Sequence, residues 1–337
     1  MKEALLWEKR DKGKVRCFLC AHGCVFGPGK RGLCEVRENV DGSLYSLVYG
    51  LLIAKNVDPI EKKPLFHVYP GSFSYSIATV GCNFKCSFCQ NADISQMPAD
   101  HDRITGQVAT PESVVQDAVA RSCRSIAYTY TEPTIYFEYA LDTSKLAIDK
   151  GIINVFVTNG YMSPECLDMA APYLAAANVD LKSFQDSYYK EQCKARLQPV
   201  LDSLSKMKDL GIWVEITTLL IPGLNDSDQE LRDIARFIRG LGPETPWHIS
   251  RFYPTYRLIS VPPTPAESVR RARQIGLEEG LHYVYTGNLP GDEGEKTHCP
   301  GCSRVLIDRR GYLISRNTLS AGKCPHCGWV VPGIGMA

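Results

Sequence analysis

Thr79-Val-Gly-Cys82-Asn-Phe-Lys-Cys86-Ser-Phe-Cys89-Gln-Asn91 is the stretch that decides the fold, because it places three cysteines with CxxxCxxC spacing directly after a strand-like segment. A closed structural metal site needs four protein ligands, whereas this stretch supplies three, with no fourth cysteine nearby in the sequence. A cubane iron–sulfur cluster held by three thiolates keeps one iron open to another ligand. The spacing therefore predicts a chemical site at the active-site edge of a parallel α/β sheet.

Strand-like and helix-like segments alternate from this stretch onward. Helical periodicity is expected near 111–122, 135–150, 164–176, 197–210, 227–240 and 265–280. The strands are expected at 73–80, 125–130, 154–158, 177–183, 213–219 and 247–252. This alternation predicts a parallel sheet wound by right-handed crossovers.

Two of the expected strands have one entirely polar face. Asn178, Asp180 and Lys182 alternate with apolar residues, and Glu215 with Thr217 repeats the pattern. A closed eight-stranded barrel fills its lumen with branched apolar side chains, so these polar faces favour a sheet that curves round a cavity for a polar cofactor. A flat, doubly wound sheet with hydrogen-bonded polar residues is the alternative.

Two groups of four cysteines flank the expected sheet. The N-terminal group lies in a glycine-rich segment and comprises Cys17, Cys20, Cys24 and Cys34. Its spacing suits zinc and an iron–sulfur cluster equally well. The C-terminal group forms two CxxC pairs around a hairpin-like segment and comprises Cys299, Cys302, Cys324 and Cys327. Paired CxxC sequences of this kind favour structural zinc over a rubredoxin-like iron.

Other cysteines and histidines are expected to have supporting or structural roles. The histidines next to the outer groups are expected to support those sites rather than to ligate, because each group already has four thiolates: His22, His298 and His326. Cys123 and Cys166 are expected to be ordinary buried thiols.

The overall composition is that of a globular chain. It has 337 residues, 14 cysteines, 44% hydrophobic residues and a formal net charge of +1. No apolar run approaches the ~18 residues of a membrane span, and the N-terminus has charges on both sides of only four apolar residues, too few for a signal sequence. We therefore expect a cytoplasmic protein with reduced cysteines and no membrane partner. The near-zero charge disfavours nucleic acid, although residues 296–327 contain six Lys or Arg against one Asp.

Residues 81–91 resemble the cluster motif of the radical S-adenosylmethionine (radical SAM) superfamily, including the aromatic residue before the third cysteine. Further segments resemble the AmmeMemoRadiSam system radical SAM enzymes, which are described as pyruvate formate-lyase activating enzyme-like. These segments are Asp58-Pro-Ile-Glu-Lys-Lys-Pro64, Pro70-Gly-Ser72, Tyr130-Thr-Glu-Pro133, Val157-Thr-Asn-Gly160 and Asp180-Leu-Lys182. The likeness extends over essentially the whole chain.

The resemblance implies a partial (β/α)6 TIM-like barrel with a small four-cysteine metal-binding module at each end of the chain. We expect an N-terminal module with an extended lead-in at 1–70, the barrel at 71–288 and a zinc-ribbon-like module at 289–337. It further implies a 4Fe-4S cluster on Cys82, Cys86 and Cys89 that cleaves S-adenosylmethionine reductively to a 5'-deoxyadenosyl radical. A reductant such as ferredoxin or flavodoxin would supply the electron.

The resemblance also implies the residues that contact S-adenosylmethionine: Phe88, Thr131, Glu132, Thr158, Asn159, Asp180 and Lys182. The family usually has Gly-Gly-Glu where this chain has Tyr130-Thr131-Glu132. The two larger side chains hinder a close backbone approach to the cofactor, while the Glu132 carboxylate can still pair with an ammonium group.

The residues that act on the substrate are harder to predict. Cys193, His248 and Arg251 are candidates, and the last two should point to opposite faces of one strand. The substrate itself is open, and protein partners or a protein substrate are compatible with the resemblance. The alternatives are activation of a glycyl-radical enzyme and a non-enzymatic RNA-binding or electron-transfer iron–sulfur protein.

Overall fold

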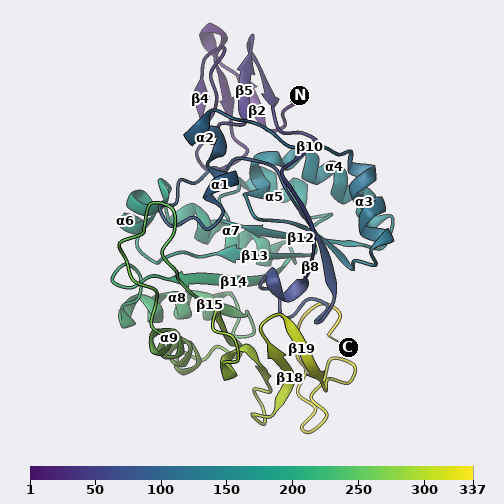
Figure 1. The fold of residues 1–337 in the computed structure, drawn as a ribbon, viewed down its shortest axis with the longest axis vertical. Coiled ribbons are helices and arrows are strands. Elements are labelled where there is room, and N and C mark those ends of the chain that lie inside the picture. Colours follow the sequence, from purple (N-terminus) through teal and green to yellow (C-terminus); the bar gives the residue numbers. More distant parts are fainter. Residues whose placement is uncertain (337) are drawn as a thin grey trace.

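An eight-stranded sheet forms the centre of the computed structural model, which describes residues 1–336 (Figure 1). Its strands are β8 (Ala54–Pro59), β9 (Phe73–Ala78), β11 (Ser125–Tyr128), β12 (Ile153–Thr158), β13 (Ala176–Asp180), β14 (Trp213–Leu220), β15 (Trp247–Arg251) and β16 (Val284–Gly287). The spatial order is β16-β15-β14-β13-β12-β11-β9-β8. Every neighbouring pair from β9 to β16 is parallel, and β8 runs antiparallel to β9. The six predicted strands are confirmed.

The sheet has one strand at each edge that the sequence did not predict. Strand β8 was not predicted because its Ala54–Pro59 segment is charged and ends in proline, a composition tolerated at the edge of a sheet. Strand β16 was missed because it is only four residues long and adjoins a turn-rich segment. The prediction of a strand over 177–183 was too long: β13 ends at Asp180, so Lys182 lies in the loop that follows.

Helices connect the strands and cover the outer face of the sheet. The principal helices are α3 (Pro111–Ala120), α4 (Phe137–Ile148), α5 (Pro164–Ala170), α7 (Gln198–Asp209), α8 (Asp228–Leu241) and α9 (Ala266–Glu278). Short turns of helix are α1 (Ala92–Ser95), α2 (Met97–His101), α6 (Asp186–Tyr188) and the π-helix Tyr189–Cys193. In α8 the Ser227 side chain caps the first turn by accepting from the Glu230 N–H, and Leu231, Ile234 and Ile238 are buried on one face.

The two faces of the sheet differ as the alternation predicted. Val179 and Ile216 are fully buried with the apolar core. On the opposite face the Thr217 hydroxyl donates to Asn178 Oδ1 at 2.9 Å, and Asn178 Nδ2 donates to the Pro64 carbonyl at 2.8 Å. The polar face is therefore covered in part by the chain before β9. Within residues 1–336 the edge strands β8 and β16 are not paired with each other, so the barrel is partial and open.

The N-terminal strands form small sheets at one end of the molecule, drawn in purple at the top of Figure 1. The strands are β1 (Lys2–Glu3), β2 (Trp7–Lys9), β3 (Val15–Cys17), β4 (Val25–Phe26), β5 (Arg37–Val40) and β6 (Ser43–Ser46), and β7 (Leu51–Leu52) pairs with β10 (Gln107–Val108). A buried ion pair joins this part to the barrel, because Arg37 Nη1 lies 2.8 Å from Glu138 Oε1 on α4.

The C-terminal strands β17 (Thr297–His298), β18 (Val305–Arg310) and β19 (Leu313–Asn317) form a separate sheet at the opposite end (Figure 1). Leu306 and Ile307 pack in a cluster with Phe66 and Tyr285, which joins this sheet to the barrel. The division of the chain at residues 70 and 288 stays a prediction. No helix within residues 1–336 combines the length and apolar composition needed to cross a membrane.

Candidate functional site

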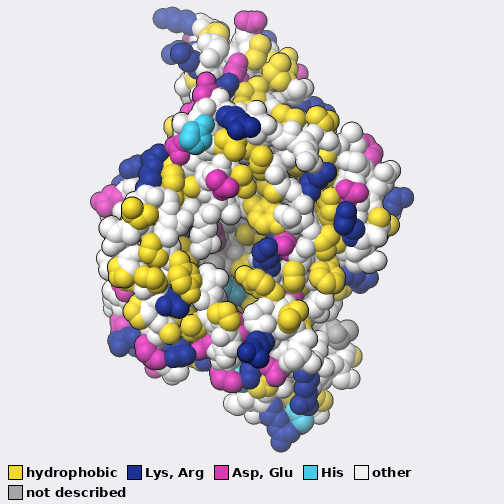
Figure 2. All heavy atoms as spheres, in the orientation of Figure 1, with side chains coloured by type: hydrophobic (Ala, Val, Ile, Leu, Met, Phe, Trp, Pro, Cys, Tyr) yellow, Lys and Arg dark blue, Asp and Glu magenta, His cyan; other side chains and the backbone are white. Residues whose placement is uncertain are grey.

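A cavity of about 590 Å³ lies at the carboxyl ends of the central strands. Figure 2 shows a hollow near the centre of the face of the molecule that is drawn there. The cavity is lined by the three central cysteines and by all seven residues expected to contact S-adenosylmethionine: Cys82, Cys86, Cys89, Phe88, Thr131, Glu132, Thr158, Asn159, Asp180 and Lys182. The fold thus brings together side chains that lie far apart in the sequence.

The cysteine loop begins at Gly81, where the chain leaves β9. Gly81 has φ +102°, and a Cβ atom there would lie 2.8 Å from Val36 Cγ1, so glycine is required. The loop is held by backbone hydrogen bonds to the π-helix segment: Lys85 N–H donates to the Cys193 carbonyl and Ser87 N–H to the Gln192 carbonyl, each at 2.9 Å. These contacts fix the cysteines against the cavity wall.

The three thiols fit a multi-iron cluster better than a single ion. In residues 1–336, only the C-terminal cysteines bring three or more Cys, His, Asp or Glu ligand atoms within 4.8 Å of one another. The sulfurs of Cys82, Cys86 and Cys89 are therefore more widely spaced than those of the C-terminal cysteines. A cubane needs such spacing because each cysteine binds a different iron. The trio lines an open cavity, which leaves room for a further ligand.

A fourth thiol, which the sequence did not place here, adjoins the trio. Cys193 is fully buried in the π-helix Tyr189–Cys193, and the interaction of its thiol with Cys86 lowers the pKa of Cys86. Burial raises the pKa of Cys193 itself, which keeps its proton in place as a donor. Cys193 does not line the cavity, so its position favours support of Cys86 over contact with substrate.

Glu132 connects the ends of neighbouring strands inside the cavity. Its Oε1 accepts hydrogen bonds from Thr158 Oγ1 at 2.7 Å and from the Thr134 backbone and hydroxyl at 3.1 and 2.5 Å. Its Oε2 accepts from the Asn159 N–H at 2.8 Å. Burial raises the pKa of this carboxyl group, and the hydrogen bonds oppose that rise. Because Oε2 has one donor, it keeps acceptor capacity for a ligand ammonium group.

Asn159 and Thr131 hold the cysteine loop against the strand ends. Asn159 Nδ2 donates to Asn83 Oδ1 at 2.7 Å, and its Oδ1 accepts from the Tyr161 N–H. Thr131 Oγ1 donates to the Thr79 carbonyl at 2.9 Å. Both side chains therefore form hydrogen bonds within the protein, so their role toward a cofactor would be to position the residues around it.

Lys182 brings a positive charge next to the cysteines. Its Nζ lies 2.8 Å from Asp180 Oδ2 and 5.8 Å from the centroid of the Phe88 ring. Burial alone would lower the pKa of Lys182, but the negative charges of Asp180 and of a Cys86 thiolate raise it well above its usual value. Lys182 therefore stays charged and available to an anionic ligand group.

His248 and Arg251 have different surroundings, as predicted for opposite faces of one strand. His248 lines the cavity and its Nε2 lies 2.7 Å from Glu215 Oε2. Arg251 does not line the cavity; its Nε donates to the Thr264 carbonyl at 2.6 Å and its guanidinium lies over the Tyr253 ring. Of these two substrate-side candidates, only His248 is positioned for contact with a ligand.

Sequence reasoning missed a charged group on the other side of the cavity. Lys63 Nζ lies 2.6 Å from Asp58 Oδ2, which also accepts from the Tyr130 hydroxyl. Burial lowers the pKa of Lys63 to about 8, although Asp58 opposes the shift. Tyr130, which lines the cavity, has φ +62°, a conformation that costs energy for a non-glycine residue.

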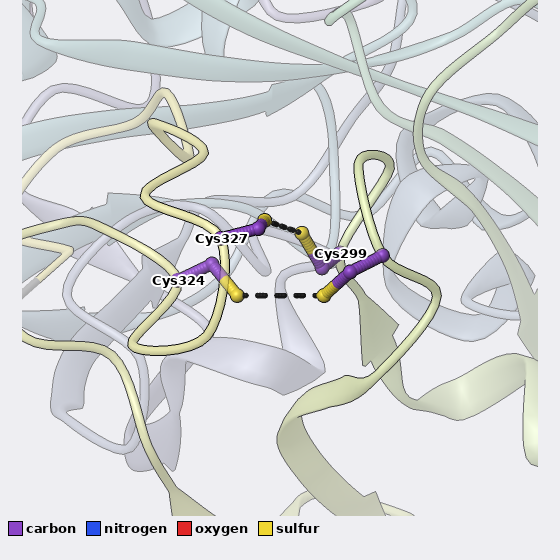
Figure 3. Close-up of side chains that lie close together, drawn as sticks. Cys299, Cys324 and Cys327 are labelled. Atoms are coloured by element: carbon purple, nitrogen blue, oxygen red, sulfur yellow. Dashed lines mark hydrogen bonds between the residues drawn. The ribbon is translucent and has the colours of Figure 1, made fainter.

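The C-terminal cysteines form a compact site (Figure 3). Cys299 and Cys327 have their sulfurs 3.4 Å apart, and Cys302 and Cys324 have theirs 3.7 Å apart. Tetrahedral zinc with Zn–S distances of about 2.3 Å requires sulfurs about 3.8 Å apart. The four residues therefore fit a single metal ion.

The neighbouring histidines and the remaining thiols have no metal-ligand geometry. His298 Nδ1 lies 3.4 Å from the Ser303 carbonyl, His326 Nδ1 lies 2.7 Å from Arg304 Nη1, and His22 Nε2 lies 2.8 Å from the Asn83 carbonyl. Cys123 and Cys166 are buried and lie outside the three groups.

The basic residues of the C-terminal module do not all form a free patch. Figure 2 shows Lys and Arg side chains gathered at this tip of the molecule. However, Arg309 is fully buried and lies 3.7 Å from Glu61, and Lys296 pairs with Glu293 and Asp308. This pairing weakens the case for RNA binding that was based on the number of basic residues.

Comparisons with known proteins agree with this geometry. The model of the Radical SAM superfamily matches residues 76–238. An uncharacterized protein of Methanocaldococcus jannaschii is 47% identical over 333 residues, which cover 97% of this chain and 98% of that protein. A second protein of the same organism, named a putative glycyl-radical enzyme activating enzyme, is 26% identical over 208 residues, covering 60% of this chain and 76% of its own length.

Pyruvate formate-lyase-activating enzyme of Clostridium pasteurianum is 23% identical over 161 residues, covering 48% of this chain and 67% of that enzyme. Among solved structures, a radical SAM methyltransferase from Sphaerobacter thermophilus has a TM-score of 0.51 at 19% identity, covering 65% of this chain and 67% of that chain, and it has the same fold. This chain belongs to the radical SAM superfamily and is an activating-enzyme-like radical SAM enzyme.

Proposed function

We propose that this enzyme holds a 4Fe-4S cluster on Cys82, Cys86 and Cys89, binds S-adenosylmethionine along the polar strand ends and processes its substrate in the rest of the cavity. One observation carries the proposal: a single cavity is lined by the three cysteines and by all seven expected cofactor contacts. When bound and reduced, the cluster and S-adenosylmethionine supply the 5'-deoxyadenosyl radical that abstracts hydrogen from a substrate.

The side chains of the cavity have complementary roles toward S-adenosylmethionine. Glu132 Oε2 would accept from the cofactor's ammonium group, while Thr158 and Thr134 hold Oε1 in place. Lys182 would donate to its carboxylate or hydroxyl oxygens. Phe88 is 3% exposed and lines the cavity, so it would exclude water beside the third cysteine.

The substrate would enter from the side of the cavity that includes the C-terminal module. Glu295 and Tyr312 line the cavity together with His248 and Thr286 of the barrel. Tyr312 is half exposed at the turn between β18 and β19. A wall contributed by a separate module suits a protein substrate that contacts both parts. Activation of a glycyl-radical enzyme is a second candidate, supported by the names of two relatives, and it would produce a glycyl-radical EPR signal in the partner enzyme.

The C-terminal site would hold structural zinc. Its four sulfurs lie within 4.8 Å of one another, the compact arrangement expected around one tetrahedral ion. The N-terminal cysteines would hold zinc or an iron–sulfur cluster. We further propose a cytoplasmic location and a one-electron reductant of the ferredoxin or flavodoxin class, as the oxygen-sensitive chemistry requires.

Anaerobic reconstitution followed by reduction with dithionite in the presence of S-adenosylmethionine tests this proposal. Wild-type protein should form 5'-deoxyadenosine and methionine, and Cys86→Ala should form neither. Cys123→Ala is the matched control because Cys123 is also buried but lies outside the cavity, so this variant should retain product formation. Absence of 5'-deoxyadenosine from fully reconstituted wild-type protein would contradict the proposal, as would its formation by Cys86→Ala.

A further inference from the structure

The four N-terminal cysteines converge on a cavity of their own, although they come from separate turns of the chain. The cavity has a volume of about 20 Å³, and all four cysteines line it. Cys17 ends strand β3, and its N–H donates to the Cys24 carbonyl at 2.9 Å. We refer to Cys17, Cys20, Cys24 and Cys34 as the N-terminal cysteines and to Cys82, Cys86 and Cys89 as the catalytic cysteines.

The N-terminal cysteines are arranged differently from the compact C-terminal site. In residues 1–336, only the C-terminal group brings three or more ligand atoms within 4.8 Å of one another. The N-terminal sulfurs therefore lie farther apart than the sulfurs around one zinc ion. A cubane, in which each thiolate binds a separate iron, requires this wider arrangement.

Arg37 and Asn83, which line the same cavity, each have a buried N–H donor without a partner. Arg37 Nη1 and Nη2 bond to Glu138 and to the Leu5 carbonyl, whereas Arg37 Nε has no partner. Asn83 Nδ2 likewise has none, although Asn83 Oδ1 accepts from Asn159. Buried polar groups in proteins are normally hydrogen-bonded. The sulfide ions and thiolates of an iron–sulfur cluster would supply the missing acceptors.

The N-terminal cavity lies between the protein surface and the catalytic cavity. Cys20 lines both the N-terminal cavity and a second, surface cavity of about 600 Å³. On the inner side, Asn83 follows Cys82 in the sequence and bonds to Asn159 of the catalytic cavity at 2.7 Å. Thr134 also lines the N-terminal cavity and donates to Glu132 of the catalytic cavity. Asn83 and Thr134 therefore belong to the wall between the two cavities.

We propose that the N-terminal cysteines hold a second four-iron cluster that passes electrons from an external low-potential reductant to the catalytic cluster. The inference rests on the proposed function, because it requires a cluster on the catalytic cysteines. The reductant loses one electron, the N-terminal cluster gains it, and the same electron then reduces the catalytic cluster. No bond is formed or broken in this relay, and each transfer leaves the N-terminal cluster ready for the next electron.

Metal analysis of a variant that lacks the catalytic cysteines tests the site directly. In C82A/C86A/C89A the N-terminal cysteines are intact, so about four irons per chain should remain after anaerobic reconstitution. Zinc should not exceed about one per chain, the complement of the C-terminal site. Iron close to zero in this variant, with or without a second zinc, would overturn the proposal.

Spectroscopy of the reduced wild-type protein tests the proximity of the two clusters. Two reduced clusters in these adjoining cavities should broaden each other's EPR signals, and the triple variant should give one narrow signal. Two additive signals without broadening would overturn the relay. Reduced flavodoxin provides the kinetic probe: C20S/C24S should be reduced at its catalytic cluster more slowly than wild type, and an equal rate would also overturn the relay.

These results separate the inference from the proposed function. If 5'-deoxyadenosine forms but the triple variant holds no iron, the inference fails while the proposed function stands. If the triple variant holds four irons but wild-type protein forms no 5'-deoxyadenosine, the proposed function fails and the N-terminal site remains an iron–sulfur site.

Discussion

Replacing Glu132 with glutamine removes the charge that we expect to bind the ammonium group of S-adenosylmethionine. The shape of the side chain is nearly unchanged, but one carboxylate oxygen becomes an NH₂ group. Oε1 has three donors and Oε2 has the Asn159 N–H, so the glutamine oxygen should take the position of Oε1. The NH₂ group then faces the Asn159 N–H, and two donors oppose each other.

The magnitude follows from these contacts. An unsatisfied buried N–H group should reduce the free energy of unfolding by about 1–3 kcal/mol. Loss of a charge-assisted hydrogen bond to the cofactor should reduce the binding free energy by about 1.5–3 kcal/mol. At 1.4 kcal/mol per tenfold change, the dissociation constant for S-adenosylmethionine should rise by about 10- to 150-fold.

Anaerobic calorimetry with reconstituted protein measures this affinity, and urea unfolding measures the stability. Glu230→Gln is a matched control because Glu230 is also buried and also accepts several hydrogen bonds, from Phe184 N–H at 3.0 Å and Gln185 Nε2 at 2.7 Å among others. Glu230 does not line the cavity, so this variant should lose stability without losing affinity. An E132Q protein with full iron content and an affinity within twofold of wild type would refute the reasoning.

Three further predictions concern the surroundings of the site. Cys193→Ala should keep the iron of the catalytic cluster but lower its reduction potential in an EPR-monitored titration, because the interaction that favours the negatively charged form of Cys86 is lost; loss of iron would show instead that Cys193 is a ligand. Arg37→Met leaves the buried carboxylate of Glu138 unpaired and should cost about 3–5 kcal/mol in urea unfolding, with much of the loss recovered in R37M/E138Q; a loss below about 1 kcal/mol would contradict the role of this ion pair. Burial lowers the pKa of His67 to about 4, so unfolding should bind a proton and stability should fall as the pH decreases from about 6.5 to 4; a His67→Gln variant should show a weaker dependence over this window, and an equal dependence would count against the assignment.

The parts of the fold that are encoded locally could be predicted from the sequence. The alternation of polar and apolar residues along single segments was sufficient to predict six strands and the polar face at Asn178 and Asp180. The edge strands β8 and β16 were not predictable, because they are defined by their neighbours and not by a strong pattern of their own. Spacing likewise identified the cysteine groups, while their different geometries emerged only from the three-dimensional arrangement.

The residues of the candidate site that lie in sequence motifs were predicted. The residues that reach the site only through long-range contacts were missed. Glu132 and the catalytic cysteines lie in recognisable motifs and line one cavity. Cys193 reaches Cys86 through a π-helix, whose extra residue per turn no periodicity revealed. Lys63 reaches the cavity through its pairing with Asp58, and this contact depends on the path of the chain before β9. Such long-range contacts have no local sequence signal.

Mössbauer spectroscopy of the ⁵⁷Fe-reconstituted protein tests most directly whether three thiolates leave one iron open to S-adenosylmethionine. C20S/C24S is the suitable protein, because it isolates the catalytic cluster from the proposed second one. Our account predicts that adding S-adenosylmethionine changes the isomer shift of one iron in four and leaves the other three unchanged. A fully assembled cluster whose four irons are all unaffected by S-adenosylmethionine would contradict it, and would point to Cys193 as a fourth ligand.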